Sequence, residues 1–357
     1  MAGIDAVVLV GGQGTRLRPL TLSAPKPMLP TAGVPLLTHL ISRIRDAGVS
    51  HIVLGTSYRA EVFSDHFGDG AALGVELDYV VESEPLGTGG GIRNVADALR
   101  GDTVLIFNGD VLSGVDLQAL LDVHERRRAE VSLHLTRVED PRAFGCVPTS
   151  PDGLVEAFLE KDPNPVTDQI NAGTYVFTRT ALESIPTGRP VSVERETFPG
   201  LLAAGARVAA YVDATYWRDL GKPSDFVAGS ADLVRGIAPS GALPGPVGER
   251  LCLEGADVAT DAEVRGGSTV GRDCRVGAGA RVEGSVLFDG SRIGANAVVR
   301  RSVLGFGSVV EDGAVVEDAV IGDGAKIGSG VELLAGARVW PSVMLPPGSI
   351  RFSSDSS

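Results

Sequence analysis

The sequence predicts a Rossmann-like α/β domain with a three-layer, mostly parallel sheet, followed by a parallel β-helix. Three observations support this prediction. Strand-like and helical segments alternate up to about residue 236, a stretch rich in Pro and Gly follows, and a six-residue apolar repeat fills most of the remainder. With 357 residues, the chain is long enough for two domains that each bury a core. We therefore expect a first domain at 1–236, a linker at 237–250, a β-helix at 251–350 and a frayed tail at 351–357.

Six apolar runs in the first half predict strands. They lie at 6–10, 51–55, 77–82, 103–108, 130–138 and 174–178. Helical periodicity is found at 36–47, 91–99 and 117–128. Strands that alternate with helices of this length predict a mostly parallel sheet with helices on both faces.

In the second half, apolar residues recur at every sixth position in three runs. The runs are Val258, Val264, Val270, Val276 and Val282; Leu287, Ile293 and Val299; and Val303, Val309, Val315, Ile321, Ile327, Leu333, Val339 and Leu345. Small residues stand four places after many of these, among them Ala262, Ser268, Cys274, Ala280, Ala297, Gly307, Gly313, Ala319, Ala325 and Ala337. Such a repeat predicts a parallel β-helix, and the slips between runs predict corners where one coil departs from the period.

The composition argues against several classes of partner. Asp and Glu number 45 against 32 Lys and Arg, and the resulting net charge of −13 repels nucleic acids and anionic membranes. No apolar run is long enough to span a bilayer, and the first ten residues resemble a strand rather than a signal peptide. Cys146, Cys252 and Cys274 are widely spaced and suit free thiols in a reducing compartment. We expect a cytoplasmic protein that binds neither nucleic acid nor membrane.

A loop that holds phosphate is predicted directly after the first strand, in "AVVLVGGQGTRLRP". Gly11, Gly12 and Gly14 let the backbone approach an anion at the carboxyl edge of the sheet. The stretch is neither a GxGxxG fingerprint nor a GxxxxGK[ST] loop. A tight turn with surface cations is the ordinary alternative, but it does not account for Arg16, Arg18 and Lys26 on one segment that three prolines restrict.

Two aspartates and one further lysine suggest the chemistry. Asp110 ends the run "TVLIFNGD" and Asp219 lies in "YWRDLGKP"; hard carboxylate oxygens beside a phosphate loop suit Mg²⁺, whereas each alone suits an ordinary turn or cap. The chain has only four lysines against 28 arginines, and Lys161 in "FLEKDPN" is the candidate for a second anionic substrate. The alternative for Glu160 and Lys161 is a solvated charge pair. A phosphate loop, a pair of metal-binding carboxylates and a second cation together suit an enzyme that transfers a phosphoryl or nucleotidyl group.

The first half resembles the nucleoside-diphosphate-sugar pyrophosphorylases. The resemblance lies in "GGQGTRLRPLTLSAPKPMLP", "EPLGTGGGIRN", "FNGDVL", "FGCV", "LEKD", "NAGTYVF" and "WRDLGKPSDF", which occur in this order over nearly the whole first domain. It implies a nucleotidyltransferase catalytic domain at 1–236 and a β-helix of left-handed type after it. The segments "EPLGTGGG" and "VSVERETFP" favour the members that transfer a guanylyl group from GTP to mannose 1-phosphate.

The resemblance also implies roles for individual residues. The nucleotide is expected to contact Leu9, Gly11, Gly12, Gly14, Thr15, Arg16, Lys26, Glu84, Gly87, Thr88, Asn108 and Asp110. The sugar phosphate is expected at Gly145, Glu160, Lys161, Asn171 and Asp219, with Asp110 and Asp219 holding Mg²⁺. Arg16, Lys26, Asp110, Lys161 and Asp219 form the expected catalytic set. Two departures from the usual pattern are "EKD" in place of "EKP" and Cys146 in place of valine.

Three alternatives remain open at this point. The enzyme could transfer a thymidylyl, uridylyl or adenylyl group to glucose 1-phosphate. It could also carry an acyltransferase activity in the β-helix, although no histidine follows His134 to act as the base. A non-catalytic sensor that binds nucleotide sugars is the third possibility, but all five expected catalytic charges are present. The exposed ends of a β-helix also predict a homo-oligomer.

Overall fold

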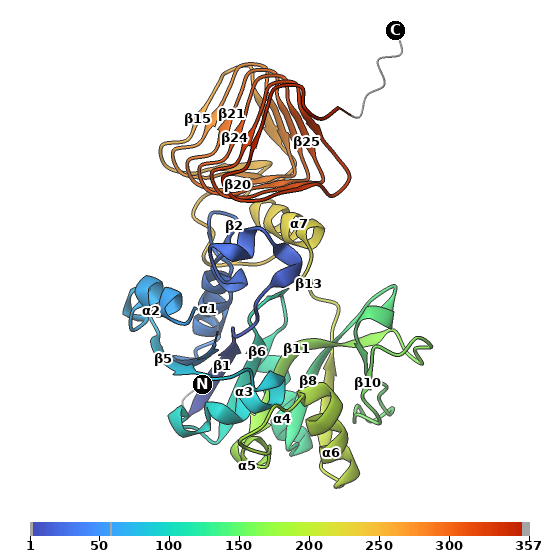
Figure 1. Ribbon diagram of the computed structural model, residues 1–357. Helices are drawn as coiled ribbons and strands as arrows, with labels where there is room; N and C mark the ends of the chain where they lie inside the picture. Colours follow the sequence, from blue (N-terminus) through green and yellow to red (C-terminus); the bar gives the residue numbers. More distant parts are fainter. Residues whose placement is uncertain (1–2, 58, 352–357) are drawn as a thin grey trace. The chain divides into compact units, whose positions relative to one another are not determined.

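The computed structural model describes residues 3–57 and 59–351, so most of the predicted frayed tail lies outside the described residues (Figure 1). Contacts divide the chain into two compact units. The first unit is Met1–Gly12 with Leu40–Trp217, and the second is Gln13–His39 with Arg218–Ser357. The segment that follows the first strand therefore belongs to the same unit as the C-terminal half. Among the described residues, no helix has both the length and the apolar character that crossing a membrane requires.

The first unit is built on a nine-stranded sheet. Its path runs β10-β9-β11-β6-β1-β4-β5, with β8 paired to β11 and β12 paired to β8. The strands are β1 (Ile4–Leu9), β4 (His51–Thr56), β5 (Glu76–Val81), β6 (Thr103–Asn108), β8 (Val131–Arg137), β9 (Gly145–Cys146), β10 (Leu159–Glu160), β11 (Gln169–Thr178) and β12 (Val208–Val212). The predicted parallel sheet is confirmed for β6-β1-β4-β5 and for β8-β12, while β11 runs antiparallel to β6 and β8.

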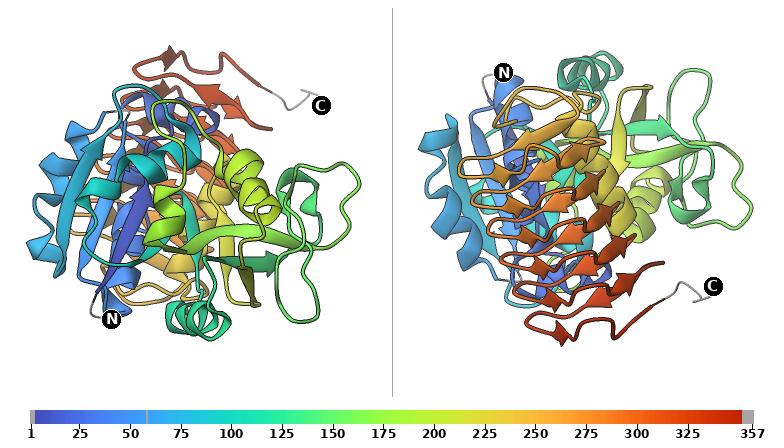
Figure 2. Two further views of the ribbon diagram at one scale, coloured as in Figure 1. Left: turned by 90° about the horizontal axis from the view of Figure 1, so that it is seen from below. Right: turned by 90° about the horizontal axis from the view of Figure 1, so that it is seen from above.

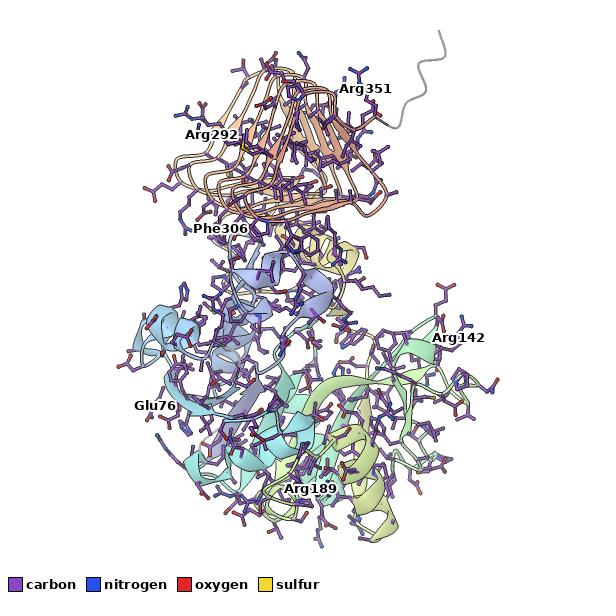
Figure 3. The ribbon with its side chains drawn as sticks, viewed as in Figure 1. Glu76, Arg142, Arg189, Arg292, Phe306 and Arg351 are labelled. Carbon is purple, nitrogen blue, oxygen red and sulfur yellow. The ribbon has the colours of Figure 1, made fainter. Side chains whose placement is uncertain are left out.

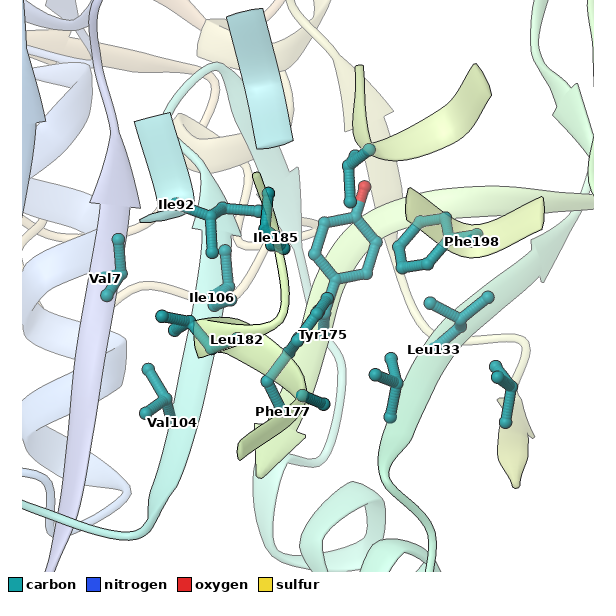
Figure 4. Packing of buried hydrophobic residues seen from close by; sticks show 14 of the residues in the cluster. Val7, Ile92, Val104, Ile106, Leu133, Tyr175, Phe177, Leu182, Ile185 and Phe198 are labelled. Atoms are coloured by element: carbon teal, nitrogen blue, oxygen red, sulfur yellow. The ribbon is translucent and has the colours of Figure 1, made fainter. Parts of the chain in front are cut away.

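Helices cover both faces of this sheet, as the three-layer prediction requires. They are α1 (Leu36–Asp46), α2 (Glu61–Phe67), α3 (Gly87–Asn94), α4 (Leu117–Arg127), α5 (Arg179–Glu183) and α6 (Phe198–Ala203), with 3₁₀ turns η4 (Ala71–Leu73), η5 (Ala96–Ala98) and η6 (Pro141–Ala143) and the π-helix η7 (Val193–Thr197). The core on one face joins Val7 and Ile106 of the strands to Ile92 of α3, Leu182 of α5 and Phe198 of α6 (Figure 4). On the other face, His124 of α4 bonds to Ser132 of β8.

The ends of α4 show how the sequence sets a helix boundary. Asp116 precedes the helix in an extended conformation, and its carboxylate accepts a hydrogen bond from the Ala119 amide at 3.0 Å. Leu117, Leu120 and Leu121 lie at helical spacing and are buried. The helix ends at Arg128, which adopts the left-handed conformation with φ of +48°.

The second unit begins with short turns. The 3₁₀ turns η1 (Thr15–Leu17), η2 (Leu20–Leu22) and η3 (Lys26–Met28) are followed by the hairpin β2 (Pro30–Thr31) and β3 (Val34–Pro35). The short strand β7 (Val111–Ser113) of the first unit and the strand β13 (Trp217–Asp219) lie outside the main sheet, and α7 (Pro223–Val234) precedes the β-helix.

The C-terminal half forms three parallel sheets, as expected for a left-handed β-helix of hexapeptide repeats. The right-hand view of Figure 2 shows its coils as successive rungs. The first face contains β14 (Arg250–Cys252), β17 (Ser268–Val270), β20 (Val286–Leu287), β23 (Val303–Leu304), β26 (Val320–Ile321) and β29 (Arg338–Val339). The second contains β15 (Asp257–Val258), β18 (Arg275–Val276), β21 (Arg292–Ile293), β24 (Val309–Val310), β27 (Lys326–Ile327) and β30 (Met344–Leu345). The third contains β16 (Glu263–Arg265), β19 (Arg281–Glu283), β22 (Val298–Arg300), β25 (Val315–Glu317) and β28 (Glu332–Leu333).

The phase of the third predicted run is wrong at its first three positions. The residues that fill the β-helix core there are Leu304, Val310 and Val316, each 0% exposed, rather than Val303, Val309 and Val315. Val309 and Val315 are half-buried, and neighbouring residues of a strand point to opposite faces. The inward small residues are correspondingly Ser308 and Ala314 instead of Gly307 and Gly313. The cause is that one corner of the coil is a residue shorter. The inward-pointing residues Val299 and Leu304 are therefore five positions apart instead of six.

Small residues are required at one corner because they bond from coil to coil. Ser268 and Ser285 accept hydrogen bonds from the amides of Ser285 and Ser302 on the next coil, at 3.1 and 3.2 Å. The Ser302 hydroxyl accepts from the Ala319 amide in the same way, at 3.1 Å. A larger side chain would not fit between the stacked backbones. These positions therefore require a residue that is small and that can accept a hydrogen bond.

The third face carries a column of charges that alternate in sign. Its register places Arg265 beside Glu283, Glu283 beside Arg300, and Arg300 beside Glu317. Glu283 pairs with Arg265 at 3.2 Å and with Arg300 at 3.7 Å, and Glu317 pairs with Arg300 at 3.9 Å. Glu283 therefore pairs with an arginine on the coil at either side of it, and Glu317 pairs with the preceding coil.

Candidate active site

The segment after β1 is folded tightly around Gly14. This residue has φ of +59°, and a Cβ placed there would lie 2.9 Å from the Cβ of Lys26 and 3.0 Å from Cγ2 of Thr21. Only glycine fits both the left-handed backbone and the close approach. The Thr21 hydroxyl donates to the Gly14 carbonyl at 3.0 Å, and Leu17 and Leu20 are buried. We call residues 14–28 the cation loop, because they hold Arg16, Arg18 and Lys26.

Two of the predicted catalytic cations lie beside residues from the end of β13. Lys26 is 5% exposed, and its Nζ lies 3.7 Å from Oδ1 of Asp219. The guanidinium of Arg16 lies against Gly221, where an added Cβ would be 2.6 Å from Nη2. A side chain at position 221 would displace Arg16, which explains the glycine in "RDLGKP". The second unit thus brings Arg16, Lys26 and Asp219 into one charged cluster.

In the first unit, the ends of β1 and β6 lie side by side. Leu9 pairs in register with Asn108, and the Gly109 amide donates to the Leu9 carbonyl at 3.0 Å. Gly11 extends β1, and its carbonyl accepts a hydrogen bond from the Ser57 hydroxyl at 2.6 Å. Asp110 follows at the same edge and is half-buried. Asp110 and the first two glycines of the motif therefore share the carboxyl edge of the sheet, where open α/β folds bind ligands.

The two segments that favoured guanylyl transfer contact each other. The Thr88 hydroxyl of α3 donates to the carboxylate of Glu194 at 2.9 Å and accepts from the Val193 amide at 2.9 Å. The Val191 carbonyl accepts from the amides of Gly89 and Gly90 at 2.8 and 3.2 Å. Segment 191–197 therefore fixes the first turn of α3, where Gly87 and Thr88 lie. Glu84, just before this helix, is exposed.

The predicted sugar-binding residues lie around β9, β10 and β11. Gly145 pairs with Glu160, and an added Cβ at Gly145 would lie 2.8 Å from a carboxylate oxygen of Glu160. Asn171 donates from Nδ2 to the phenol oxygen of Tyr175 at 2.8 Å. Burial raises the pKa of this phenol, so Tyr175 stays protonated and able to donate a hydrogen bond. Gly145, Glu160 and Asn171 are thus held by backbone pairing and by a buried polar contact.

Lys161 stands apart from this cluster in its exposure. Its side chain is 62% exposed, its backbone has φ of +53°, and its Nζ lies 3.6 Å from Oε1 of Glu160, which is 19% exposed. The charge pair considered from sequence is therefore present. An exposed pair of this kind contributes little to stability, so the lysine remains available to an anionic ligand.

The donor set fits a divalent ion that phosphate oxygens help to coordinate. No group of three or more His, Cys, Asp or Glu side chains within 3–57 and 59–351 could hold a metal ion by itself. Asp110 and Asp219 offer hard carboxylate oxygens, and Asp219 is 30% exposed beside Lys26. One or two carboxylates completed by substrate phosphates are the ligands that Mg²⁺ prefers. The joint role of these two aspartates stays a prediction.

Sequence reasoning missed three supporting residues. Ser57 follows β4 at the carboxyl edge and bonds to Gly11, a position that the parallel order of strands could have indicated. Glu194 lies in the quoted segment "VSVERETFP", but its contact with Thr88 joins positions 106 residues apart. Tyr175 lies in the quoted "NAGTYVF", four residues after Asn171, on the same long strand.

Comparisons with known proteins agree with this geometry. A sequence model of the family described as "Nucleotidyl transferase" matches residues 5–236, and one described as "GMPPB C-terminal domain" matches residues 247–351. The chain is 65% identical over 353 residues to a mannose-1-phosphate guanylyltransferase of Mycobacterium tuberculosis, covering 99% of this chain and 98% of that one. It is 35% identical to mannose-1-phosphate guanylyltransferase 1 of Arabidopsis thaliana, covering 79% of each chain.

Solved structures show the same fold. The crystal structure of HddC from Yersinia pseudotuberculosis complexed with GMP-PN has a TM-score of 0.57 and 29% sequence identity, over 64% of this chain and 99% of that chain. The matched family model spans more than half of this chain, and the first relative matches it from end to end. The chain therefore belongs to the nucleotidyl transferase family.

Proposed function

We propose that the protein transfers the guanylyl group of GTP to mannose 1-phosphate, forming GDP-mannose and releasing pyrophosphate. One observation carries the choice of substrates: the 65% identity to a mannose-1-phosphate guanylyltransferase extends over both halves of the chain. The five expected catalytic charges are all present, which supports an enzyme over a non-catalytic sensor.

In this reaction a phosphate oxygen of mannose 1-phosphate attacks the α-phosphorus of GTP in line. The new bond joins that oxygen to the α-phosphorus, and the bond from the α-phosphorus to the bridging oxygen breaks, so pyrophosphate leaves with the electron pair. Negative charge builds on the leaving group, and Arg16 and Lys26 are the cations that would offset it. Their placement before reaction matters because a fixed charge needs no reorganisation in the transition state.

Asp110 and Asp219 would hold Mg²⁺ together with the phosphates. The ion supplies a positive charge that polarises phosphate oxygens. Lys26 beside Asp219 would help to orient that carboxylate. On the sugar side, Glu160 would accept hydrogen bonds from sugar hydroxyls and Asn171 would donate to them. Gly145 would leave room for the sugar ring, and Lys161 would bind the sugar phosphate.

The test is turnover with each of four NTPs paired with mannose 1-phosphate and glucose 1-phosphate. We expect GTP with mannose 1-phosphate to give the highest kcat/KM, with release of one pyrophosphate for each GDP-mannose. Preference for a thymidine, uridine or adenosine triphosphate would replace the proposed substrates but keep the chemistry. Tight binding of GDP-mannose without any pyrophosphate release would favour the sensor, and consumption of acetyl-CoA that depends on residues 251–345 would favour the acyltransferase.

Three further proposals concern the whole protein. The catalytic domain ends near residue 236 and the β-helix begins near residue 251. The protein forms a homo-oligomer through the β-helix, a proposal supported by the exposed Trp340, Val343 and Met344 at its last coil. It works in the cytoplasm, as its three free cysteines suggest. Sedimentation of the full chain, with and without Trp340→Ser, tests the second of these.

A further inference from the structure

We infer that Arg338 of the β-helix is a positioning residue for the cation loop. It holds the carbonyl of Arg18 and thereby sets the place of Arg16 and Lys26 relative to the nucleotide. This inference deepens the proposed function and rests on it for the identity of the nucleotide. It gives the β-helix a role in the reaction besides assembly.

The central observation is one hydrogen bond between residues 320 positions apart. Arg338 begins β29, the last strand of the first face, and its Nη1 donates to the Arg18 carbonyl at 2.7 Å. Both residues belong to the second unit, in which Gln13–His39 is grouped with the C-terminal half. Arg338 is exposed, so it is available for this contact without disturbing the β-helix core.

The Arg18 carbonyl is a suitable point from which to hold the loop. The Arg18 amide closes η1 by donating to Thr15, so the residue is the C-terminal cap of the turn that contains Arg16. The next turn starts immediately afterwards, and its Thr21 hydroxyl bonds back to Gly14. A donor on the Arg18 carbonyl therefore fixes the peptide between the turn of Arg16 and the turn that braces Gly14 against Lys26.

Other contacts with residues 218–357 hold both the loop and the chain after it. Within the loop, Lys26 lies beside Asp219 and Arg16 lies against Gly221. The Ala32 amide donates to the Ser230 hydroxyl at 2.9 Å, and His39 bonds through Nδ1 to the Ser240 hydroxyl at 2.7 Å. Gly33 approaches the side chain of Leu253, where an added Cβ would lie 3.0 Å away. These anchors fix residues 32–39, and Arg338 adds a fixed point from the β-helix within residues 14–28.

Loss of this fixed point should affect GTP more than mannose 1-phosphate. Arg16 and Lys26 offset charge on the triphosphate, and small displacements of positioned groups reduce rates strongly. We expect Arg338→Ala to lower kcat/KM for GTP by about tenfold, from the loss of one charge-assisted hydrogen bond. The KM for mannose 1-phosphate should stay within about twofold, because Gly145, Glu160, Lys161 and Asn171, which are proposed to bind it, belong to the first unit.

Two variants separate positioning from general destabilisation. Arg338→Lys keeps a donor that can reach the carbonyl and should restore part of the GTP kinetics. Arg292→Ala removes an exposed arginine from β21 of the same β-helix, for which the described residues provide no ion pair, and should behave as the wild type (Figure 3). A thermal melt of each protein checks that the variants remain folded.

Hydrogen exchange of the full chain without substrates tests the contact independently of turnover. The Leu17, Arg18 and Leu22 amides, which bond within the loop, should exchange faster in Arg338→Ala than in Arg292→Ala. Equal exchange at these amides, or unchanged GTP kinetics in an active enzyme, would overturn the inference. A wild type without guanylyl transfer would instead refute the proposed function, and the exchange experiment would still decide the role of Arg338.

Discussion

At the scale of single residues, Lys26 is the cation on which the proposed chemistry most depends. It is 5% exposed, lies 3.7 Å from Asp219 and is one of only four lysines in the chain. A lysine offers a compact point charge, which suits a buried site next to a carboxylate better than a planar guanidinium.

We expect Lys26→Ala to reduce kcat about 10²- to 10³-fold, because a preorganised charge on the leaving group is lost. Steady-state pyrophosphate release at saturating substrates measures this. Lys326→Ala is the matched control, since Lys326 is exposed on β27 and lies outside the proposed site. Turnover of Lys26→Ala equal to that of the control would remove Lys26 from the mechanism.

A second residue-scale prediction concerns Thr88. Thr88→Val keeps the shape of the side chain but removes the hydroxyl that donates to Glu194 and accepts from Val193. We expect kcat/KM for GTP to fall about tenfold, because the first turn of α3 loses one of its ties to segment 191–197 and the Val193 amide loses its acceptor. Thr88→Ser retains the hydroxyl and should stay close to the wild type; similar losses in both variants would point to packing instead.

At the scale of elements, the amino-terminal edge of the sheet is held by a buried carboxylate. Asp5 of β1 accepts hydrogen bonds from the amides of Arg100 and Gly101 at 2.5 and 2.7 Å and from His51 of β4 at 2.8 Å. Burial alone would raise the pKa of Asp5, but the bonds from Gly101, His51 and Arg100 outweigh it and lower the pKa. The ionised form therefore stabilises the folded state.

The pH dependence follows from the direction of this shift. A carboxylate with a lowered folded-state pKa contributes stability above its unfolded pKa of about 3.9, and the contribution is lost as pH falls through the lower, folded value. We expect Asp5→Asn to cost about 2 kcal/mol at pH 7, and the difference from the wild type to shrink below about pH 4. Denaturant unfolding from pH 3 to pH 7 measures this. Asp97→Asn, at an exposed site, should show neither effect.

The corrected register of the β-helix gives another prediction at this scale. Leu304→Ala removes a side chain that is 0% exposed and should cost about 2 to 5 kcal/mol, whereas Val309→Ala, at a half-buried outward site, should cost less than about 1 kcal/mol. Chemical denaturation of the two variants gives the comparison. A larger loss of stability in Val309→Ala than in Leu304→Ala would instead support the strict six-residue period, in which Val309 points into the core.

At the scale of the whole molecule, the proposed chemistry depends on a divalent ion that Asp110 and Asp219 would hold. We expect a chelator to abolish GDP-mannose synthesis and added Mg²⁺ to restore it, because the ion would be coordinated by both carboxylates and the phosphates and would polarise the phosphate oxygens. The Asp110→Asn, Asp219→Asn double variant should stay inactive after Mg²⁺ is added. Its rescue to wild-type turnover would show that the ion is held elsewhere.

Much of this organisation could be predicted from the sequence because it depends on local patterns. Alternating apolar runs gave the strands of the sheet, the hexapeptide period gave the β-helix, and the glycines and cations gave the cation loop. The family resemblance supplied the predicted site residues, whose roles stay predictions. The capping of α4 by Asp116 also follows from neighbouring residues alone.

The rest depends on contacts between distant positions. Thr88 and Glu194 are 106 residues apart, and Arg18 and Arg338 are 320 apart, so no short pattern relates them. The five-residue spacing between inward positions could not be located from the sequence. At adjacent valines such as Val309 and Val310, either residue fits an apolar repeat. The antiparallel β11 and the membership of Gln13–His39 in the second unit likewise arise from tertiary packing.

The alternating charges on the third face also constrain how this β-helix can change in length. Excising one coil, the one that contains Glu283, would bring Arg265 next to Arg300 and turn attraction into repulsion. Removing two adjacent coils would again place residues of opposite charge next to each other. Shortened variants with an even number of coils deleted should thus tolerate the junction on this face better than odd ones, so that the solenoid gains or loses coils most easily in pairs.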